Sequence, residues 1–114
     1  MHNHVTIDQQ PLLALRNAIG DDKAKSYLKR FLDDCSVKTD DIQSAYKVSD
    51  FTLIQHITHT LASSSATFGA MEMHTLCRQI EDNCVNGTLS TLETDIKNLN
   101  VISDLSKDAL QEYI

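Results

Sequence analysis

The chain has 114 residues and a formal net charge of −6, so it has room for one compact domain with an acidic balance. Its three Gly and one Pro disfavour turn-rich β-sandwiches and barrels and favour a few long helices. The acidic balance argues against broad nucleic-acid binding, which needs a basic surface to neutralise phosphates, and no nucleic-acid partner is expected.

The terminus, the hydropathy and the cysteines together predict a cytoplasmic protein. The chain does not open with a basic region and an apolar run, as a secretory signal does. No stretch approaches the roughly 20 apolar residues of a membrane span. Three cysteines, an odd number within helical patterns, favour reduced thiols over disulfides. His2 and His4 are expected in a disordered terminus, and the absence of a second apolar stripe on any helix predicts a monomer.

Helix signals begin with a short first helix and a long second one. The first is predicted over about residues 9–18, with Asp8 as its N-cap and Gly20 as its C-terminal stop. The second is predicted to open with the acids Asp21 and Asp22, which suit the positive end of the helix dipole, and to close near residue 48.

Three further helices complete the chain. Ser49 is the expected N-cap of a third helix of about residues 50–68, which Gly69 ends. The fourth is predicted to end at the turn pair 86–87, and Ser90 begins a capping-box spacing for the last helix. Short loops between long amphipathic helices favour antiparallel neighbours. The sequence therefore predicts one all-α domain over residues 1–114, an up-and-down antiparallel four-helix bundle with a short additional N-terminal helix.

The helix of about residues 50–68 has an unusual predicted surface. On a helical wheel with about 100° per residue, Ile57 and Leu61 fall opposite His59, which is expected at the middle of the solvent face. Its expected neighbours there are mostly small or uncharged: Thr52, Gln55, His56, Ala62, Ser63 and Ala66. A solvated helix face ordinarily carries Lys, Glu and Arg. This face therefore indicates a docking surface, the alternative being Ala and Ser that merely fill an exposed helix.

Residues 59–70, HTLASSSATFGA, resemble the signature of histidine-containing phosphotransfer domains. The usual pattern is His, a small residue, Leu, Lys, Gly, Ser, Ser, and then an apolar residue followed by Gly-Ala. The likeness extends upstream to residues 27–34 (YLKRFLDD) and downstream to Glu81, and so covers most of the chain. The chain length and Ser63 look most like the family's stand-alone members in quorum-sensing phosphorelays.

The resemblance implies a carrier protein in a two-component phosphorelay, with residues 50–68 as its phosphoacceptor helix. His59 would accept a phosphoryl group from a receiver-domain aspartate and pass it to another receiver aspartate. The implied partners are the receiver domains of a hybrid sensor kinase and of a response regulator, with Mg²⁺ on the receiver and no cofactor on this chain. Glu81 is the candidate partner for the other ring nitrogen of His59, the alternative being a solvated acid. The candidate partner-binding residues are Gln55, His56, Ala62, Ser63 and Ala66.

Two positions depart from the family pattern. Ala62 stands where the family has Lys, which is thought to offset phosphoryl charge, and Ser63 stands where it has Gly. The first departure bears on phosphohistidine lifetime and transfer rate. It also leaves open an alternative function, a phosphate-free binding module that docks a receiver or a sensor kinase. The chain has neither a Walker pattern nor a Gly-rich kinase loop, so no intrinsic ATP-dependent kinase activity is expected.

Other combinations of chemical groups are weaker. His56 and His59, three residues apart, could hold a metal with His74 as a third ligand. Zn²⁺ sites take three or four ligands with supporting hydrogen bonds, and His74 has no fixed relation to the pair, so no metal site is predicted. Cys77 and Cys84 share one helix stripe and are predicted to be core thiols.

Overall fold

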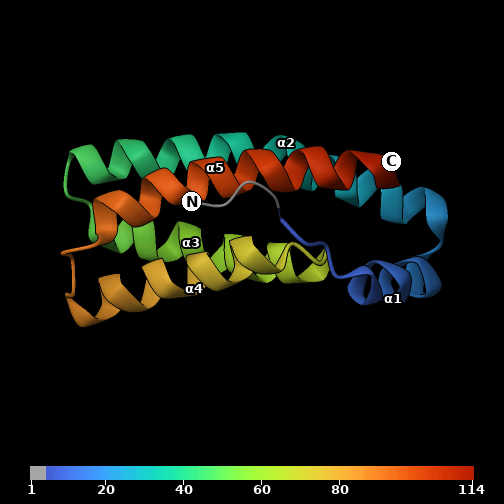
Figure 1. Cartoon of the computed structure of the whole chain (residues 1–114), viewed down its shortest axis with the longest axis horizontal. Coiled ribbons are helices and arrows are strands. Elements are labelled where there is room, and N and C mark those ends of the chain that lie inside the picture. The colour runs from blue at the N-terminus through green and yellow to red at the C-terminus, as the bar shows by residue number, and fades with distance from the viewer. Residues whose placement is uncertain (1–4) are drawn as a thin grey trace.

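A computed structural model describes residues 5–114, and His2 and His4 lie outside the described residues (Figure 1). The helices in chain order are α1 (Gln9–Ile19), α2 (Asp21–Lys47), α3 (Phe51–Thr67), α4 (Met71–Asn86) and α5 (Leu92–Leu110). A 3-10 turn over Gln111–Tyr113 follows α5. None of these helices is long and apolar enough to cross a lipid bilayer.

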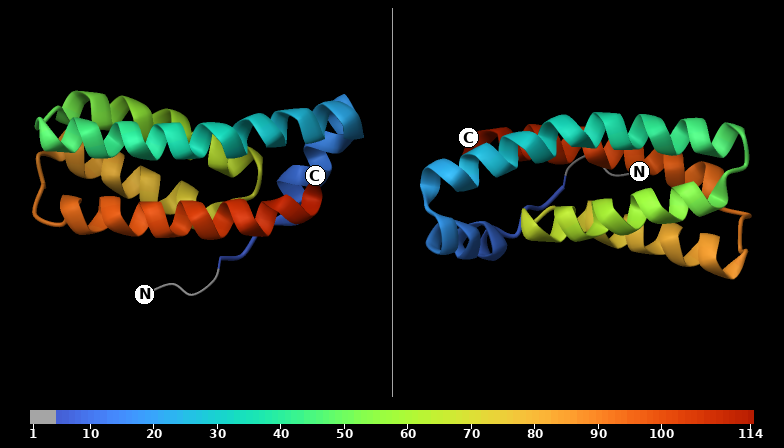
Figure 2. Two further views of the ribbon diagram at one scale, coloured as in Figure 1. Left: turned by 90° about the horizontal axis from the view of Figure 1, so that it is seen from above. Right: turned by 180° about the vertical axis from the view of Figure 1, so that it is seen from behind.

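The four long helices run alternately up and down and pack side by side (Figures 1 and 2). Contacts join α2 to α3 and α5, and α4 to α3 and α5, which closes the bundle. The short α1 packs against α2 and α3 at the end of the bundle where α2 begins. The predicted all-α bundle with a small extra N-terminal helix is confirmed.

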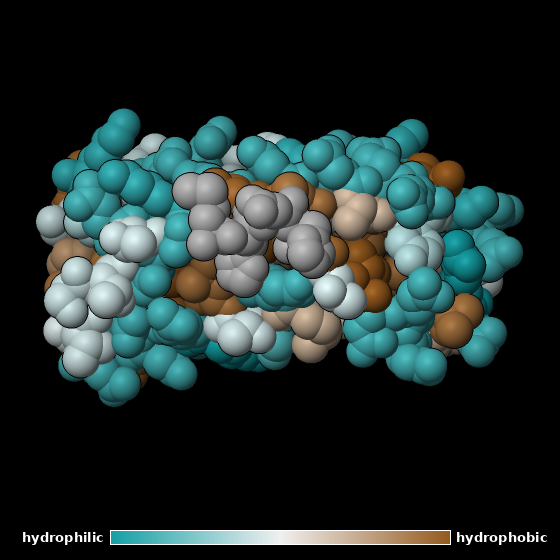
Figure 3. Space-filling view, in the orientation of Figure 1, coloured by the Kyte–Doolittle hydropathy of each residue, from teal (hydrophilic) through white to brown (hydrophobic). Residues whose placement is uncertain are grey.

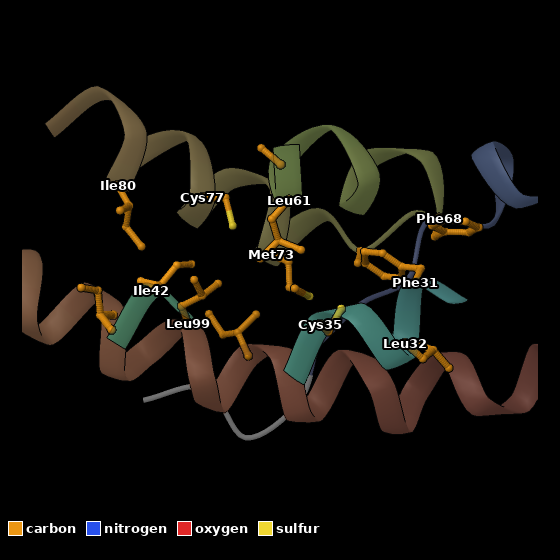
Figure 4. Packing of buried hydrophobic residues seen from close by; sticks show 14 of the residues in the cluster. Phe31, Leu32, Cys35, Ile42, Leu61, Phe68, Met73, Cys77, Ile80 and Leu99 are labelled. Atoms are coloured by element: carbon orange, nitrogen blue, oxygen red, sulfur yellow. The ribbon is translucent and has the colours of Figure 1, made fainter. Parts of the chain in front are cut away.

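Apolar side chains from all four long helices meet along the axis of the bundle (Figure 4). The rings of Phe31 and Phe68 stack with centroids 4.9 Å apart near one end of this core. Cys35 and Cys77 are fully buried, as predicted for core thiols. Cys84 lies in the last turns of α4, where it packs against the edge of the core and is only partly buried. On the face shown in Figure 3, hydrophilic side chains cover most of the surface and apolar ones gather along its middle.

Capping signals place some helix ends correctly. The Asp8 side chain accepts a hydrogen bond from the Gln10 backbone N–H at 3.0 Å, as expected of the N-cap of α1. Gly20 ends α1 with a φ of 88°. Gly87 ends α4 in the left-handed conformation that glycine adopts without steric cost.

Two predicted caps are displaced by one residue. Ser49 has a φ of 57° and its N–H donates to the Tyr46 carbonyl, so it belongs to the turn that ends α2. The N-cap of α3 is therefore Asp50, whose side chain accepts from the Leu53 N–H at 3.1 Å. The N-cap of α5 is Thr91 rather than Ser90, although neither its hydroxyl nor any other side chain bonds to the free N–H groups there.

The turn between α3 and α4 fixes how these two helices face each other. Gly69 has a φ of 77°, and a Cβ at this position would lie 2.0 Å from the Asp8 carbonyl oxygen. Only glycine allows this approach, in which the Asp8 N–H donates to the Gly69 carbonyl at 2.9 Å. The segment before α1 thus holds the turn in place, and α3 and α4 form a tight antiparallel hairpin (Figure 2).

Candidate functional site

His59 occupies the middle of α3 and points out of the bundle. Its side chain is 61% exposed. Ile54 and Leu61, which anchor the other side of α3 in the core, are fully buried. Thr58 is also fully buried, but its hydroxyl donates to the Ile54 carbonyl at 2.8 Å, so this polar residue costs the core little.

Glu81 of α4 lies directly beside the imidazole. His59 and Glu81 are equally far along the chain from Ala70, at the turn of the antiparallel hairpin, so the fold brings them opposite each other. The His59 Nδ1 and Glu81 Oε2 atoms are 2.7 Å apart. The Glu81 side chain is 15% exposed, so its carboxylate is held at the edge of the core rather than free in solvent.

A third side chain, Arg78, completes a cluster. Its Nη1 donates to Glu81 Oε1 at 3.0 Å and lies 3.4 Å from His59 Nδ1. Burial by itself raises the pKa of Glu81, but the hydrogen bonds and positive charges of His59 and Arg78 outweigh it and lower the pKa below its ordinary value. The carboxylate is therefore ionised at neutral pH and acts only as an acceptor.

This arrangement selects one form of the neutral imidazole. An ionised carboxylate can only accept, so the short contact to Glu81 requires a proton on Nδ1 of His59. The longer contact from Arg78 cannot compete, because Nδ1 then has no lone pair to offer. The unshared electron pair is left on Nε2, and no hydrogen bond joins Nε2 to any residue from 5 to 114.

The other residues predicted to lie on the solvent face around His59 differ in how exposed they are. His56 and Ser63 are exposed, and Gln55 and Ala66 are half-buried. The expectation that Ala62 lies on the solvent face is wrong, because its side chain is fully buried. The helix α4 packs over this side of α3, and His74 Nδ1 lies 2.9 Å from the Ala62 carbonyl oxygen. A wheel drawn for one helix cannot show the direction of its neighbour.

The three histidines considered as metal ligands do not come together. The ring of His74 is engaged with the Ala62 backbone, while His56 stands exposed on α3. In the described part of the chain, no three His, Cys, Asp or Glu side chains are grouped closely enough to hold a metal ion.

Arg78 is the site residue that the sequence reasoning missed. It is the only Lys or Arg between Lys47 and Lys97, and that isolation is a signal the sequence already contains. Its contact with His59 could not be read from spacing, because it depends on how α4 is rotated against α3.

A comparison with known protein families identifies the family to which this site and fold belong. Residues 26–113 match the family model described as the Hpt domain. The chain belongs to the Hpt domain family. As an Hpt domain, it is a histidine phosphotransfer module of a phosphorelay, a class that interacts with receiver domains.

A solved structure agrees with this fold. The Hpt domain is similar to the crystal structure of histidine-containing phosphotransfer protein B (HptB) from Pseudomonas aeruginosa PAO1, with a TM-score of 0.87 and 18% sequence identity. The alignment covers 98% of this chain and 95% of that one. A search of the curated proteins found no match. The likeness to that structure shows the fold, and the family match is to Hpt domains in general rather than to the quorum-sensing members that the sequence resembled.

Proposed function

We propose that this Hpt domain carries a phosphoryl group on Nε2 of His59, receiving it from a receiver-domain aspartate and passing it to another. The observation that carries the proposal is the exposed imidazole whose Nδ1 is hydrogen-bonded to the ionised Glu81 at 2.7 Å. This contact leaves the nucleophilic electron pair on the ring nitrogen that no described residue occupies.

The transfer can be written with its charges balanced. The Nε2 electron pair forms a bond to phosphorus as the phosphorus–oxygen bond of the aspartyl phosphate breaks, and the aspartate leaves as a carboxylate. The ring keeps its Nδ1 proton and becomes positively charged, so the hydrogen bond to Glu81 is strongest in the product. Passage to the next receiver reverses these steps, with an aspartate oxygen attacking phosphorus and the neutral imidazole leaving.

Glu81 has two tasks in this scheme. It fixes the tautomer and the orientation of His59 before transfer, and its negative charge stabilises the positive ring that forms during transfer. The carboxylate itself keeps its ionised form throughout, as the carboxylate of a hydrolase triad does.

The partner has to supply the rest of the machinery. Phosphoryl transfer depends on positioning and on charge stabilisation, and the receiver would bring its aspartate and Mg²⁺ to this surface. The short side chains of Ser63 and Ala66 and the polar Gln55 and His56 leave room around His59 for a second protein. We propose these four residues as the receiver contact and the cytoplasm as the compartment; the buried Ala62 is excluded from direct contact.

The direct test is transfer from receiver domains encoded in the same genome, charged with acetyl phosphate and Mg²⁺. We expect acid-labile, base-stable label on the wild-type protein and none on His59→Gln. His56→Gln is the matched control for the chemistry, because it removes another exposed imidazole one turn away on the same helix; it should still become labelled on His59, even where the loss of a receiver contact slows the transfer. Failure of every charged receiver to label the wild type, or equal labelling of His59→Gln, would refute the assignment.

The replacement of the family Lys by Ala62 favours a second candidate, a phosphate-free module that only docks a receiver or sensor kinase. This candidate predicts that a receiver binds wild type and His59→Ala equally well and that no phosphohistidine forms in cells. The same binding and labelling measurements therefore distinguish the two functions.

A further inference from the structure

Among residues 5–114, Arg78 is the cationic side chain in contact with the imidazole of His59. The helices α3 and α4 contain a single Lys or Arg, Arg78, because residues 48–77 and 79–96 contain neither. The guanidinium contacts Glu81 at 3.0 Å and approaches the imidazole at 3.4 Å. Its side chain is 40% exposed, so part of it remains open to a group that arrives from solvent.

Arg78 on α4 also lies across the hairpin from Ala62 on α3, which has a short side chain. Ala62 and Arg78 are equally far from Ala70 in the hairpin, just as His59 and Glu81 are. Ala62 ends at its Cβ and is fully buried, so it contributes no charge to the site. The helix α4 therefore provides the cation that α3 does not.

A phosphoryl group on His59 would create a charge problem. A phosphoryl group carries roughly −1.5 to −2 at neutral pH, and it would form beside the negative carboxylate of Glu81. The guanidinium approaches the ring at Nδ1, so it acts on a phosphoryl group at Nε2 through its positive charge across the ring rather than through a hydrogen bond. A guanidinium suits this task because it stays positively charged at every pH at which the transfer would run.

We propose that Arg78 is a positioning residue for phosphotransfer, holding Glu81 against His59 and offsetting the negative charge of the phosphoryl group. The inference rests on the proposed function, since it assumes that His59 is the phosphoacceptor. In this proposal, Arg78 of α4 supplies the positive charge that α3 lacks, because α3 has Ala62 and no Lys or Arg.

The test uses phosphoramidate, which can donate a phosphoryl group to an imidazole with loss of ammonia and requires no receiver. We expect Arg78→Gln to be phosphorylated about three- to fivefold more slowly than wild type, the upper part of the range for one partly exposed charge contact. Arg78→Lys should stay within about twofold of wild type, because it keeps the charge. Arg16→Gln is the matched control, since it removes an equal charge from α1 at the end of the bundle.

Salt dependence separates an electrostatic role from a structural one. The wild-type rate should fall as potassium chloride rises, because salt screens exposed charges, and the rate of Arg78→Gln should depend on salt much less. If Arg78→Gln matches Arg16→Gln in rate and salt dependence, or Arg78→Lys is as slow as Arg78→Gln, the inference is overturned. The proposed function fails separately, by the absence of label on wild-type His59 or by its persistence in His59→Gln.

Discussion

Replacing Glu81 by Gln isolates the charge of the carboxylate from its hydrogen bond. A glutamine amide oxygen can still accept from the Nδ1 proton of His59, but it cannot offset the positive charge that the ring gains during transfer. Glu81→Ala removes the acceptor as well. We therefore expect transfer rates in the order wild type, Glu81→Gln, Glu81→Ala.

The size of the charge effect follows from the geometry. The two interacting atoms are 2.7 Å apart, and unit charges about 3 Å apart attract by about 1.4 kcal/mol in a water-like medium. The water-like value is appropriate because the His59 side chain is 61% exposed. About 1.4 kcal/mol corresponds to a factor of ten in rate, and the ring carries its full charge only once transfer is complete, so Glu81→Gln should slow transfer by about three- to tenfold.

The assay is single-turnover transfer from a charged receiver, measured by rapid quenching over a range of receiver concentrations. The rate constant should fall while the receiver affinity stays within about twofold, because Glu81 is largely covered and supports the ring rather than the interface. Glu93→Gln on α5, an exposed acid, provides a charge-matched control. Transfer by Glu81→Gln within twofold of wild type would refute the role given to the carboxylate.

Three further predictions concern thiols, acid stability and a buried hydroxyl. Burial raises the pKa of Cys35 and Cys77 to about 12, so at pH 8 a thiol reagent should label the partly exposed Cys84 first; rapid labelling of either buried thiol in the native protein would contradict this. The folded protein lowers the pKa of Glu81 below its ordinary 4.5, so the stability this group provides is complete above about pH 4.5 and is lost as the pH falls below that value. Urea unfolding between pH 6 and 3 should show a smaller acid-induced loss of stability for Glu81→Gln than for wild type, and equal losses would exclude this linkage. The Ser106 hydroxyl is buried without a hydrogen-bond partner among residues 5–114, so Ser106→Ala should raise the free energy of unfolding by about 0.5–1 kcal/mol, and a measured decrease would show that the hydroxyl is bonded in solution.

Local signals in the sequence were sufficient to predict the helices and to predict that His59 points away from the core. Asp8, Gly20 and Gly87 act within one turn of the helix ends that they define, so their effect is visible in the sequence alone. Ser49 shows where this reasoning fails by one residue. A serine between two helices can end one or begin the next, and the tight turn after α2 decides that Asp50 begins α3.

What the sequence determined was a bundle of amphipathic helices with one imidazole opposite a core stripe, because both follow from periodicity within single helices. Only the packing of α4 against α3 buried Ala62 and brought Glu81 and Arg78 to the ring of His59. Glu81 and Arg78 follow His59 by 22 and 19 residues, across the turn that contains Gly69. Whether they reach the imidazole depends on how α4 is rotated about its own axis. That rotation is set by the whole core, so no single segment of the sequence encodes it.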